Sequence, residues 1–250
     1  MYVISFLNKK GGVGKTTLAV HTAYALAESF DARVLLIDND DQGNSSQFFD
    51  VAGEINFADV LDGSCGIEKA IKHTRVEGID IIPSDIRLAE ANIEMIKADK
   101  QNSMILKTAL APIGSKYDIC IIDNPPRIDS MTVVNSILAS DELIIVCTPD
   151  LFAISGVAQM KDIIDEAKEY NPNIRVRCLI NMYSNTDGDM TFKISGLIPN
   201  FNTKIRKSKN PRIPVDTAMM NHLTMFEAAP QSAFSQDMMK FVEEMTQGEE

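Results

Sequence analysis

Short apolar runs rich in Val and Ile recur along the chain, and a stretch with helical periodicity follows most of them. Several runs are apolar at nearly every position, as is typical of parallel strands that helices cover on both faces. The predicted strands are Tyr2–Leu7, Arg33–Ile37, Ile79–Ile82, Tyr117–Ile122, Glu142–Cys147 and Ile174–Ile180. The predicted helices are Lys15–Ser29, about Asp85–Leu110, Ser130–Ala139 and Ser155–Glu169. This alternation predicts an α/β fold with a doubly wound, mostly parallel sheet and right-handed crossovers.

The alternation changes toward the C-terminus. Asn, Lys and Pro accumulate at Asn185–Asp189 and Pro199–Pro214, which we interpret as a functional surface loop region. A last helix is predicted over roughly Ser232–Met245. One stripe of this helix is apolar and is expected to pack into the core: Phe234, Met238, Phe241, Val242 and Met245. The other face carries Asp237, Glu243 and Glu244 with a single Lys240, so anionic lipid would repel it and we expect no membrane attachment.

Composition is that of an ordinary globular protein. The 250 residues are 45% hydrophobic and 24% charged, which excludes collagen-like and disordered classes and favours a single domain over residues 1–250. The net charge of −11 argues against a globally basic nucleic-acid coat, although a local basic patch remains compatible with it. The four cysteines have no CxxC spacing, and the chain shows neither a signal peptide nor a membrane-spanning run. We therefore expect a reducing, cytoplasmic location.

A glycine-rich segment between the first strand and the first helix carries the clearest chemistry. The segment reads Asn8-Lys9-Lys10-Gly11-Gly12-Val13-Gly14-Lys15-Thr16-Thr17. Glycines let successive backbone N–H groups converge on phosphate oxygens, and the helix N-terminus adds its dipole. Lys15 is then expected to reach the β- and γ-phosphates of ATP, while the Thr16 hydroxyl ligates Mg²⁺. The standard GxxxxGK[ST] pattern would have a glycine at position 9, where this chain has Lys9.

Carboxylates stand at the ends of two predicted strands. Asp38 and Asp40 follow the second strand, and Asp123 ends the fully apolar run that precedes Asn124-Pro125-Pro126. Ligands of open α/β sheets bind at these carboxyl ends. A carboxylate beside a buried strand is costly unless it is solvated or paired, and a bound Mg²⁺ provides such a partner.

The segment KKGGVGKTT resembles the deviant Walker A box of the ParA/MinD class of P-loop ATPases, and Lys10 matches its signature lysine. The resemblance implies that Lys10 crosses a dimer interface to the partner's nucleotide. It also implies that Asp40 orients or activates the attacking water, with Asp38 and Asp123 near Mg²⁺. Asn181 and Met182 match the strand end near the adenine.

The chain departs from this family pattern at several positions. Asp41 stands where proline is usual, Asn124 replaces a threonine, and Arg127 follows the two prolines where small polar residues are common. The loop Ile205–Ser208 also differs from the family's base-holding loop.

The likeness is closest to the short partition ATPases of plasmids and chromosomes. Only seven residues precede Asn8, so we expect no N-terminal helix-turn-helix. The resemblance implies a homodimer in the ATP state that binds DNA without sequence preference and a ParB-type centromere-binding partner, hence a nucleoid-associated ATPase that is weak alone and stimulated by its partner. A basic cluster provides candidate DNA contacts: Lys204, Arg206, Lys207, Lys209 and Arg212. We expect Arg175 and Arg177 to extend it.

Two other functions fit the same sequence features. A relative of this kind could position protein cargo instead of DNA, because the cargo adaptor is a separate chain. A small-molecule ligase or phosphotransferase could share the fold, but it would need a further set of polar substrate residues, which the sequence does not display.

Overall fold

The computed structural model describes residues 1–97, 104–150, 153–208 and 213–247. Its centre is an eight-stranded sheet in the order β3-β4-β2-β5-β1-β6-β7-β8. The strands are β1 (Tyr2–Leu7), β2 (Val34–Asp38), β3 (Lys72–His73), β4 (Ile79–Ile82), β5 (Ile119–Asp123), β6 (Glu142–Cys147), β7 (Arg175–Tyr183) and β8 (Asn200–Arg206). Neighbouring strands from β4 to β8 pair in parallel, and β3 pairs antiparallel with β4. The predicted mostly parallel sheet is confirmed.

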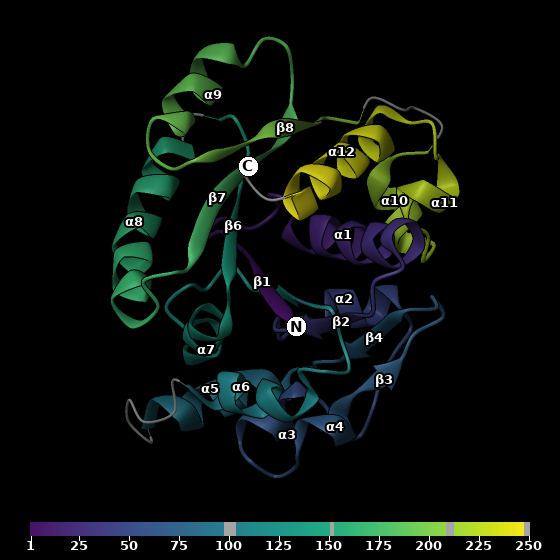
Figure 1. The fold of residues 1–250 in the computed structure, drawn as a ribbon, viewed down its shortest axis with the longest axis vertical. Coiled ribbons are helices and arrows are strands. Elements are labelled where there is room, and N and C mark those ends of the chain that lie inside the picture. Colours follow the sequence, from purple (N-terminus) through teal and green to yellow (C-terminus); the bar gives the residue numbers. More distant parts are fainter. Residues whose placement is uncertain (98–103, 151–152, 209–212, 248–250) are drawn as a thin grey trace.

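Helices cover both faces of the sheet (Figure 1). They are α1 (Lys15–Phe30), α2 (Asn44–Phe48), α3 (Phe57–Leu61), α4 (Ile67–Ala70), α5 (Arg87–Lys97), α6 (Ile105–Leu110), the 3-10 turn η2 (Ala111–Ile113), α7 (Met131–Ala139), α8 (Ala153–Tyr170), α9 (Gly188–Ser195), α10 (Val215–Met220), α11 (Met225–Ala228) and α12 (Ala233–Gln247). Helices α1 and α10–α12 share one hydrophobic cluster with the sheet, and α3–α9 pack on the other face. Two-sided burial explains the continuous apolar strands, because both faces of each strand meet a helix.

The six predicted strands are all present, with ends that differ by at most three residues. The single helix predicted over about Asp85–Leu110 is represented by α5 and α6, and the segment between them includes residues outside the described part of the chain. The interpretation of Asn185–Asp189 and Pro199–Pro214 as loops was wrong in part. Helix α9 begins within the first segment, and strand β8 lies within the second.

Strand β8 escaped prediction because its own residues carry a weak strand pattern. Phe201 and Ile205 are its fully buried apolar side chains, and Asn and Thr surround them. Helix α12 supplies the missing stabilisation from outside the strand. The Glu244 carboxylate accepts hydrogen bonds from the backbone N–H groups of Asn202 (2.6 Å) and Thr203 (2.8 Å). An edge strand otherwise leaves such groups unpaired.

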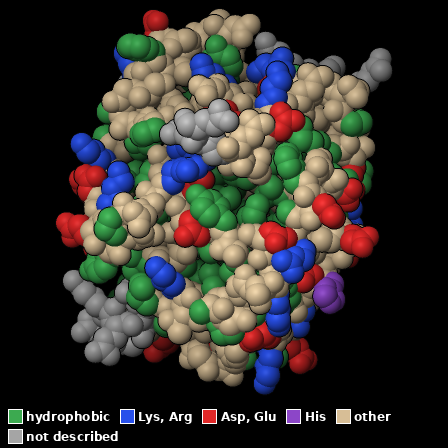
Figure 2. Space-filling view, viewed as in Figure 1, with side chains coloured by type: hydrophobic (Ala, Val, Ile, Leu, Met, Phe, Trp, Pro, Cys, Tyr) green, Lys and Arg blue, Asp and Glu red, His purple; other side chains and the backbone are tan. Residues whose placement is uncertain are grey.

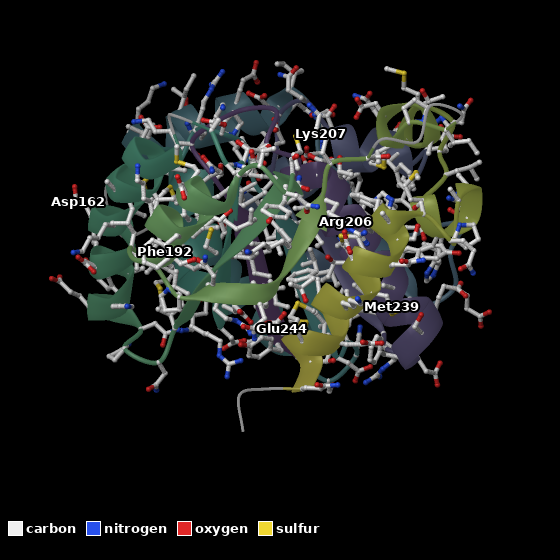
Figure 3. All side chains as sticks on the ribbon, turned by 90° about the horizontal axis from the view of Figure 1, so that it is seen from above. Asp162, Phe192, Arg206, Lys207, Met239 and Glu244 are labelled. Carbon is white, nitrogen blue, oxygen red and sulfur yellow. The ribbon has the colours of Figure 1, made fainter. Side chains whose placement is uncertain are left out.

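The apolar stripe predicted for the last helix is confirmed, since its five side chains are all buried in α12. Its acidic face is not simply solvated, however. Asp237 is 5% exposed and accepts hydrogen bonds from the backbone and side chain of Arg206. Figure 3 shows α12 alongside β8, with Glu244 toward one end of the strand and Arg206 toward the other. The sequence pattern of the helix did not reveal these contacts, because it carries no information about an adjacent strand edge.

Candidate functional site

The glycine-rich segment forms a loop whose conformation depends on its glycines. Gly12 and Gly14 have φ angles of 74° and 93°, a region that other residues rarely adopt. A Cβ atom on Gly14 would overlap the side-chain amide of Asn181, whereas a Cβ on Gly11 or Gly12 would meet no atom within 4 Å. The loop is therefore packed against β7 on one side and open on the other. It leads directly into α1, which begins at Lys15.

The open side of the loop faces a cavity of about 510 Å³. Its walls combine the loop and the start of α1 with the segments that follow β2 and β5, the end of β7 and α10: Gly11, Gly12, Gly14, Lys15, Thr16, Thr17, Asp40, Asp41, Gln42, Asn44, Pro125, Pro126, Arg127, Met182 and Asp216. Strands β2, β5 and β1 are neighbours in the sheet, so their carboxyl ends converge here. The structure thus brings together the predicted loop residues and Asp40. Asp216 was missed, because no local motif marks it.

The two predicted functional lysines differ in their surroundings. Lys15 is 7% exposed, and burial lowers the pKa of its ammonium group, while the carboxylates of Asp123 and Asp40 act in the opposite direction. Lys10 directly precedes Gly11 of the cavity wall, has half of its side chain exposed, and its Nζ is 2.7 Å from Oδ2 of Asp150. Its backbone N–H donates to Oδ1 of Asn8 at 2.7 Å. Lys15 is placed to bind a ligand inside the cavity, and Lys10 to reach outside it.

The surroundings of Asp123 show whether the site suits a divalent cation. Its Oδ2 accepts a hydrogen bond from the Ser45 hydroxyl at 2.8 Å, and the nearby Ser45 and Thr16 hydroxyls lower the pKa of this carboxyl against the effect of burial. Its Oδ1 is buried with no hydrogen-bond partner among the described residues. Burial raises the pKa of Asp123, and a nearby cation would favour the charged form. An unpaired oxygen beside a threonine hydroxyl suits Mg²⁺, which also takes water and phosphate oxygens as ligands.

Asp38 sits deeper than the cavity wall. It is paired in register with Asp123 across β2 and β5, and it is fully buried. Its Oδ2 accepts from the backbone and hydroxyl of Ser46, and its Oδ1 accepts from the backbone N–H of Asp40. Burial and the neighbouring Asp123 carboxylate raise the pKa of Asp38. Within the described residues no group of three His, Cys, Asp or Glu side chains could hold a metal. Metal ligation by Asp38 thus stays a prediction.

Asp40 is the carboxylate of this set that lines the cavity. One of its oxygens accepts from the backbone N–H of Gln42 at 3.1 Å, and the Ser84 hydroxyl donates to its backbone carbonyl. Burial is the main cause that raises the pKa of Asp40 above its ordinary value. A partly desolvated carboxylate at a cavity wall is suited to accept a proton from a water molecule or to orient it.

A second hollow of about 170 Å³ adjoins the first and has mainly apolar walls. Met182 has a φ angle of 56°, and it lines both spaces together with Gly14, Thr17 and Asp216. The Asn181 amide donates to the carbonyl of Val13 at 2.8 Å, and its Oδ1 accepts from the N–H of Met182. The loop residues Arg206, Lys207 and Ser208 also line this hollow, although they differ from the family pattern.

Comparisons with known proteins agree with this geometry. The family model described as an AAA domain matches residues 1–176. A ParA family protein of Chlamydia trachomatis is 30% identical over 253 residues, covering 98% of this chain and 97% of that protein. The chain belongs to the ParA family. The resemblance to this group of P-loop NTPases, predicted from the loop and the acidic strand ends, is confirmed.

Solved structures place the ParA-family chain in the same fold. The complex of Cyanothece McdA(D38A) with ATP superposes with a TM-score of 0.85 at 19% identity, covering 100% of this chain and 98% of that one. Cobyrinic acid a,c-diamide synthase of Mycobacterium smegmatis, with bound ADP and magnesium, gives a TM-score of 0.82 at 24% identity and covers 97% and 93%. At these identities the likeness shows the fold alone.

One departure of this ParA-family member from the usual pattern has a structural explanation. The Asn124 amide donates to the carbonyls of Phe6 (3.2 Å) and Ile122 (3.3 Å), and its oxygen accepts from Asn39 (2.8 Å) and Ser136 (2.7 Å). Asn124 therefore ties β1, β5 and α7 together. The other two departures face each other, with Nη1 of Arg127 4.0 Å from Oδ2 of Asp41.

The predicted DNA contacts of the ParA-family chain are only partly described. Lys209 and Arg212 lie outside the described residues. Lys207 is exposed, and Nζ of Lys204 lies 5.0 Å from the centroid of the Tyr183 ring. Arg206 is bound to Asp237 at 2.8 Å.

The expectation that Arg177 extends this surface is wrong. Arg177 is 4% exposed, its Nε donates to the buried Glu142 at 2.6 Å, and its guanidinium stacks on Phe201. The alternation of Arg175 and Arg177 does not reveal that β8 and α12 cover one face.

No helix in the described part of the chain is long and apolar enough to cross a membrane.

Proposed function

We propose that this chain is a Mg²⁺-dependent ATPase switch that dimerises around ATP, binds DNA without sequence preference and drives the partition of a plasmid or chromosome. One observation carries the proposal: a glycine loop, Lys15, Thr16 and Asp40 line a single cavity, and the half-exposed Lys10 directly precedes Gly11 of its wall. The ParA-family membership supports the same function. The neighbouring apolar hollow offers room for the base of the nucleotide.

The residues divide the work of phosphoryl transfer. Backbone N–H groups of Gly11–Thr17 and the ammonium group of Lys15 bind the phosphate chain. Thr16 and Asp123 would hold Mg²⁺, which when bound offsets negative charge on the phosphate oxygens. Asp40 orients the attacking water and accepts its proton, since its carboxylate faces the cavity. Asp38 fixes this arrangement by accepting hydrogen bonds from the backbone N–H of Asp40 and from that of Ser46 in α2.

Lys10 would act across the dimer. In the single subunit its ammonium group is neutralised by Asp150, whose carboxylate also accepts from the Thr148 hydroxyl at 2.5 Å. Half of the Lys10 side chain is exposed, so little must be unpacked for it to turn toward a second subunit. A cation supplied to the partner's triphosphate stabilises charge that develops during transfer.

DNA binding and partner control complete the proposal. Lys204 and Lys207 lie near the carboxyl end of β8, and two copies in a dimer would form a wider basic surface. A ParB-type protein would accelerate hydrolysis and thereby release the dimer from DNA. Without that partner we expect slow turnover, because the useful output is a change of state.

Sedimentation velocity tests the dimer. With Mg²⁺ and a slowly hydrolysed ATP analogue we expect a species of twice the monomer mass, and with ADP or no nucleotide a monomer. Lys10→Ala should bind the analogue yet remain monomeric, whereas Lys9→Ala, a change at the neighbouring exposed lysine, should dimerise normally. A wild-type chain that stays monomeric with saturating analogue would overturn the proposal.

Turnover measurements separate this function from that of a small-molecule ligase or phosphotransferase. We expect slow ATP hydrolysis with water alone and acceleration by DNA together with a ParB-type protein. An enzyme of the other class would require its small substrate and would ignore DNA.

A further inference from the structure

Arg127 occupies a position in the cavity that the proposed mechanism leaves unused. It follows Pro125 and Pro126 after β5, and it lines the same cavity as Lys15, Thr16 and Asp40. Its side chain is 71% exposed, so the guanidinium group can move without unpacking the core. The two prolines have restricted φ angles, which keep the base of the side chain in place.

The charge balance of the cavity shows what Arg127 contributes. Three carboxylates line the space, from Asp40, Asp41 and Asp216, against the two cations of Lys15 and Arg127. Without Arg127, the side chains that line the cavity would present three carboxylates and one cation to a triphosphate that arrives with its Mg²⁺. Repulsion between like charges would then oppose binding.

The contact between Arg127 and Asp41 is a loose one. Their nearest atoms are 4.0 Å apart, and the arginine side chain is largely in water. The other oxygen of Asp41 already accepts a hydrogen bond from the Gln42 side chain at 2.8 Å. An ion pair at 4.0 Å whose arginine is largely in water contributes little, so a ligand with several negative charges can compete for the guanidinium.

We propose that Arg127 is a phosphate-binding cation that the chain supplies to its own nucleotide, and that Asp41 holds it at the cavity wall until the triphosphate enters. The inference rests on the proposed nucleotide function and deepens it. A guanidinium presents two parallel N–H donors in a fixed plane to two phosphate oxygens, whereas the Lys15 ammonium acts as a point charge without that fixed geometry. Arg127 and Asp40 follow the neighbouring strands β5 and β2, so the guanidinium is assigned to the terminal phosphate, where Asp40 acts.

A purely structural role for the pair would give different results. If Arg127 only joined the loop after β2 to the loop after β5, its loss would alter stability and would affect ATP and ADP binding alike. If it binds the terminal phosphate, its loss affects ATP far more than ADP. A lysine at position 127 would keep part of the effect, because it retains the charge but loses the two-pronged geometry.

Equilibrium titration with a fluorescent, slowly hydrolysed ATP analogue and with fluorescent ADP, both with Mg²⁺, tests the assignment. Arg127→Gln should lower the affinity for the ATP analogue about tenfold and the affinity for ADP less than about threefold. The affinity of Arg127→Lys for the analogue should lie between those of wild type and Arg127→Gln. A tenfold change corresponds to about 1.4 kcal/mol. Asp41→Asn should raise the affinity for the analogue a few-fold. The same substitution made in the Arg127→Gln variant should raise the affinity less, because there is then no guanidinium to release.

Arg33→Gln is the matched control, because Arg33 forms its own exposed ion pair with Asp118 at 2.8 Å and does not line the cavity. It should leave both affinities unchanged. Equal loss of ATP and ADP affinity in Arg127→Gln, or no loss, would overturn the inference. Lys15→Ala in the same titration keeps the two proposals apart. If wild type binds ATP and Lys15→Ala does not, the nucleotide site stands whatever Arg127 does; if wild type binds neither nucleotide, the proposed function itself is wrong.

Discussion

His21 links the phosphate loop to the C-terminal part of the chain through both of its ring nitrogens. Nδ1 lies 2.6 Å from the carbonyl of Thr17, and Nε2 accepts from the backbone N–H of Met225 at 2.8 Å. These partners require a neutral ring, with its proton on Nδ1. The ring is fully buried and packs edge-on against Phe234, and burial lowers its pKa to about 4.

This buried histidine makes the free energy of unfolding depend on pH. In the unfolded chain His21 gains a proton below about pH 6.5, whereas in the folded chain it stays neutral until about pH 4. Above pH 6.5 the histidine therefore does not make the free energy of unfolding depend on pH. Below pH 6.5 the free energy of unfolding falls by about 1.4 kcal/mol per pH unit, to a total loss of about 3 kcal/mol near pH 4. Urea unfolding of wild type and His21→Gln between pH 7 and pH 4.5 measures it. The difference in free energy of unfolding should narrow as pH falls, and a constant difference would exclude His21 as the cause.

Asp40 should separate nucleotide binding from turnover. Asp40→Asn keeps the shape of the side chain but cannot accept the proton of the attacking water. We expect the variant to bind ATP and dimerise, with hydrolysis slower by roughly 10²–10⁴-fold. Single-turnover hydrolysis and analogue titration measure the two steps. Asp50→Asn, at an exposed position outside this cavity, is the control, and normal hydrolysis by Asp40→Asn would remove Asp40 from the mechanism.

Among the larger elements, the last helix and the edge strand stabilise each other. Helix α12 buries its apolar stripe against α1 and β8, and the Glu244 carboxylate accepts hydrogen bonds from two backbone N–H groups of the strand. Truncation by Glu244→Ala would leave both groups without their acceptor. We expect a loss of about 1–3 kcal/mol in the free energy of unfolding and faster hydrogen exchange at Asn202 and Thr203. Glu243→Ala, at the adjacent exposed position, should change neither quantity.

The elements that could be predicted from the sequence are those whose own residues determine them. Strands such as β1 and β6 are apolar at nearly every position because helices bury both faces, so their limits were predicted correctly. The phosphate loop is equally local, since its glycines, Lys15 and Thr16 are contiguous. Strand β8 could not be predicted in this way, because α12 stabilises it from more than 25 residues away.

Parts of the candidate site depend on strand order in the same manner. The approach of Arg127 to Asp41 follows from the neighbouring positions of β2 and β5, and neither residue carries a sequence signal for the other. Asp216 reaches the cavity from α10, late in the chain. The sequence therefore indicated the loop residues that we propose bind phosphate, but not which additional charges line the cavity beside them.

At the scale of the whole molecule, charge is mixed instead of segregated. The net charge is −11, and Figure 2 shows acidic and basic side chains interspersed over the face in view. An acidic protein can bind DNA only through a local surface where the basic side chains are not already paired. Since Asp237 neutralises Arg206, the described residues leave Lys204 and Lys207 as the main cationic groups at the carboxyl end of β8.

Reversing these two lysines should weaken DNA binding without affecting the dimer. Each dimer of Lys204→Glu/Lys207→Glu loses four lysines, and if all four contact phosphates the slope of log K against log salt becomes shallower by roughly 3.6. DNA retention with the ATP analogue, measured from 50 to 200 mM salt, gives this slope. The control Lys116→Glu/Lys168→Glu changes net charge equally at exposed positions that precede the amino ends of β5 and β7, whereas Lys204 and Lys207 lie near the carboxyl end of β8. Equal losses in both variants would show that net charge, not this surface, governs DNA binding.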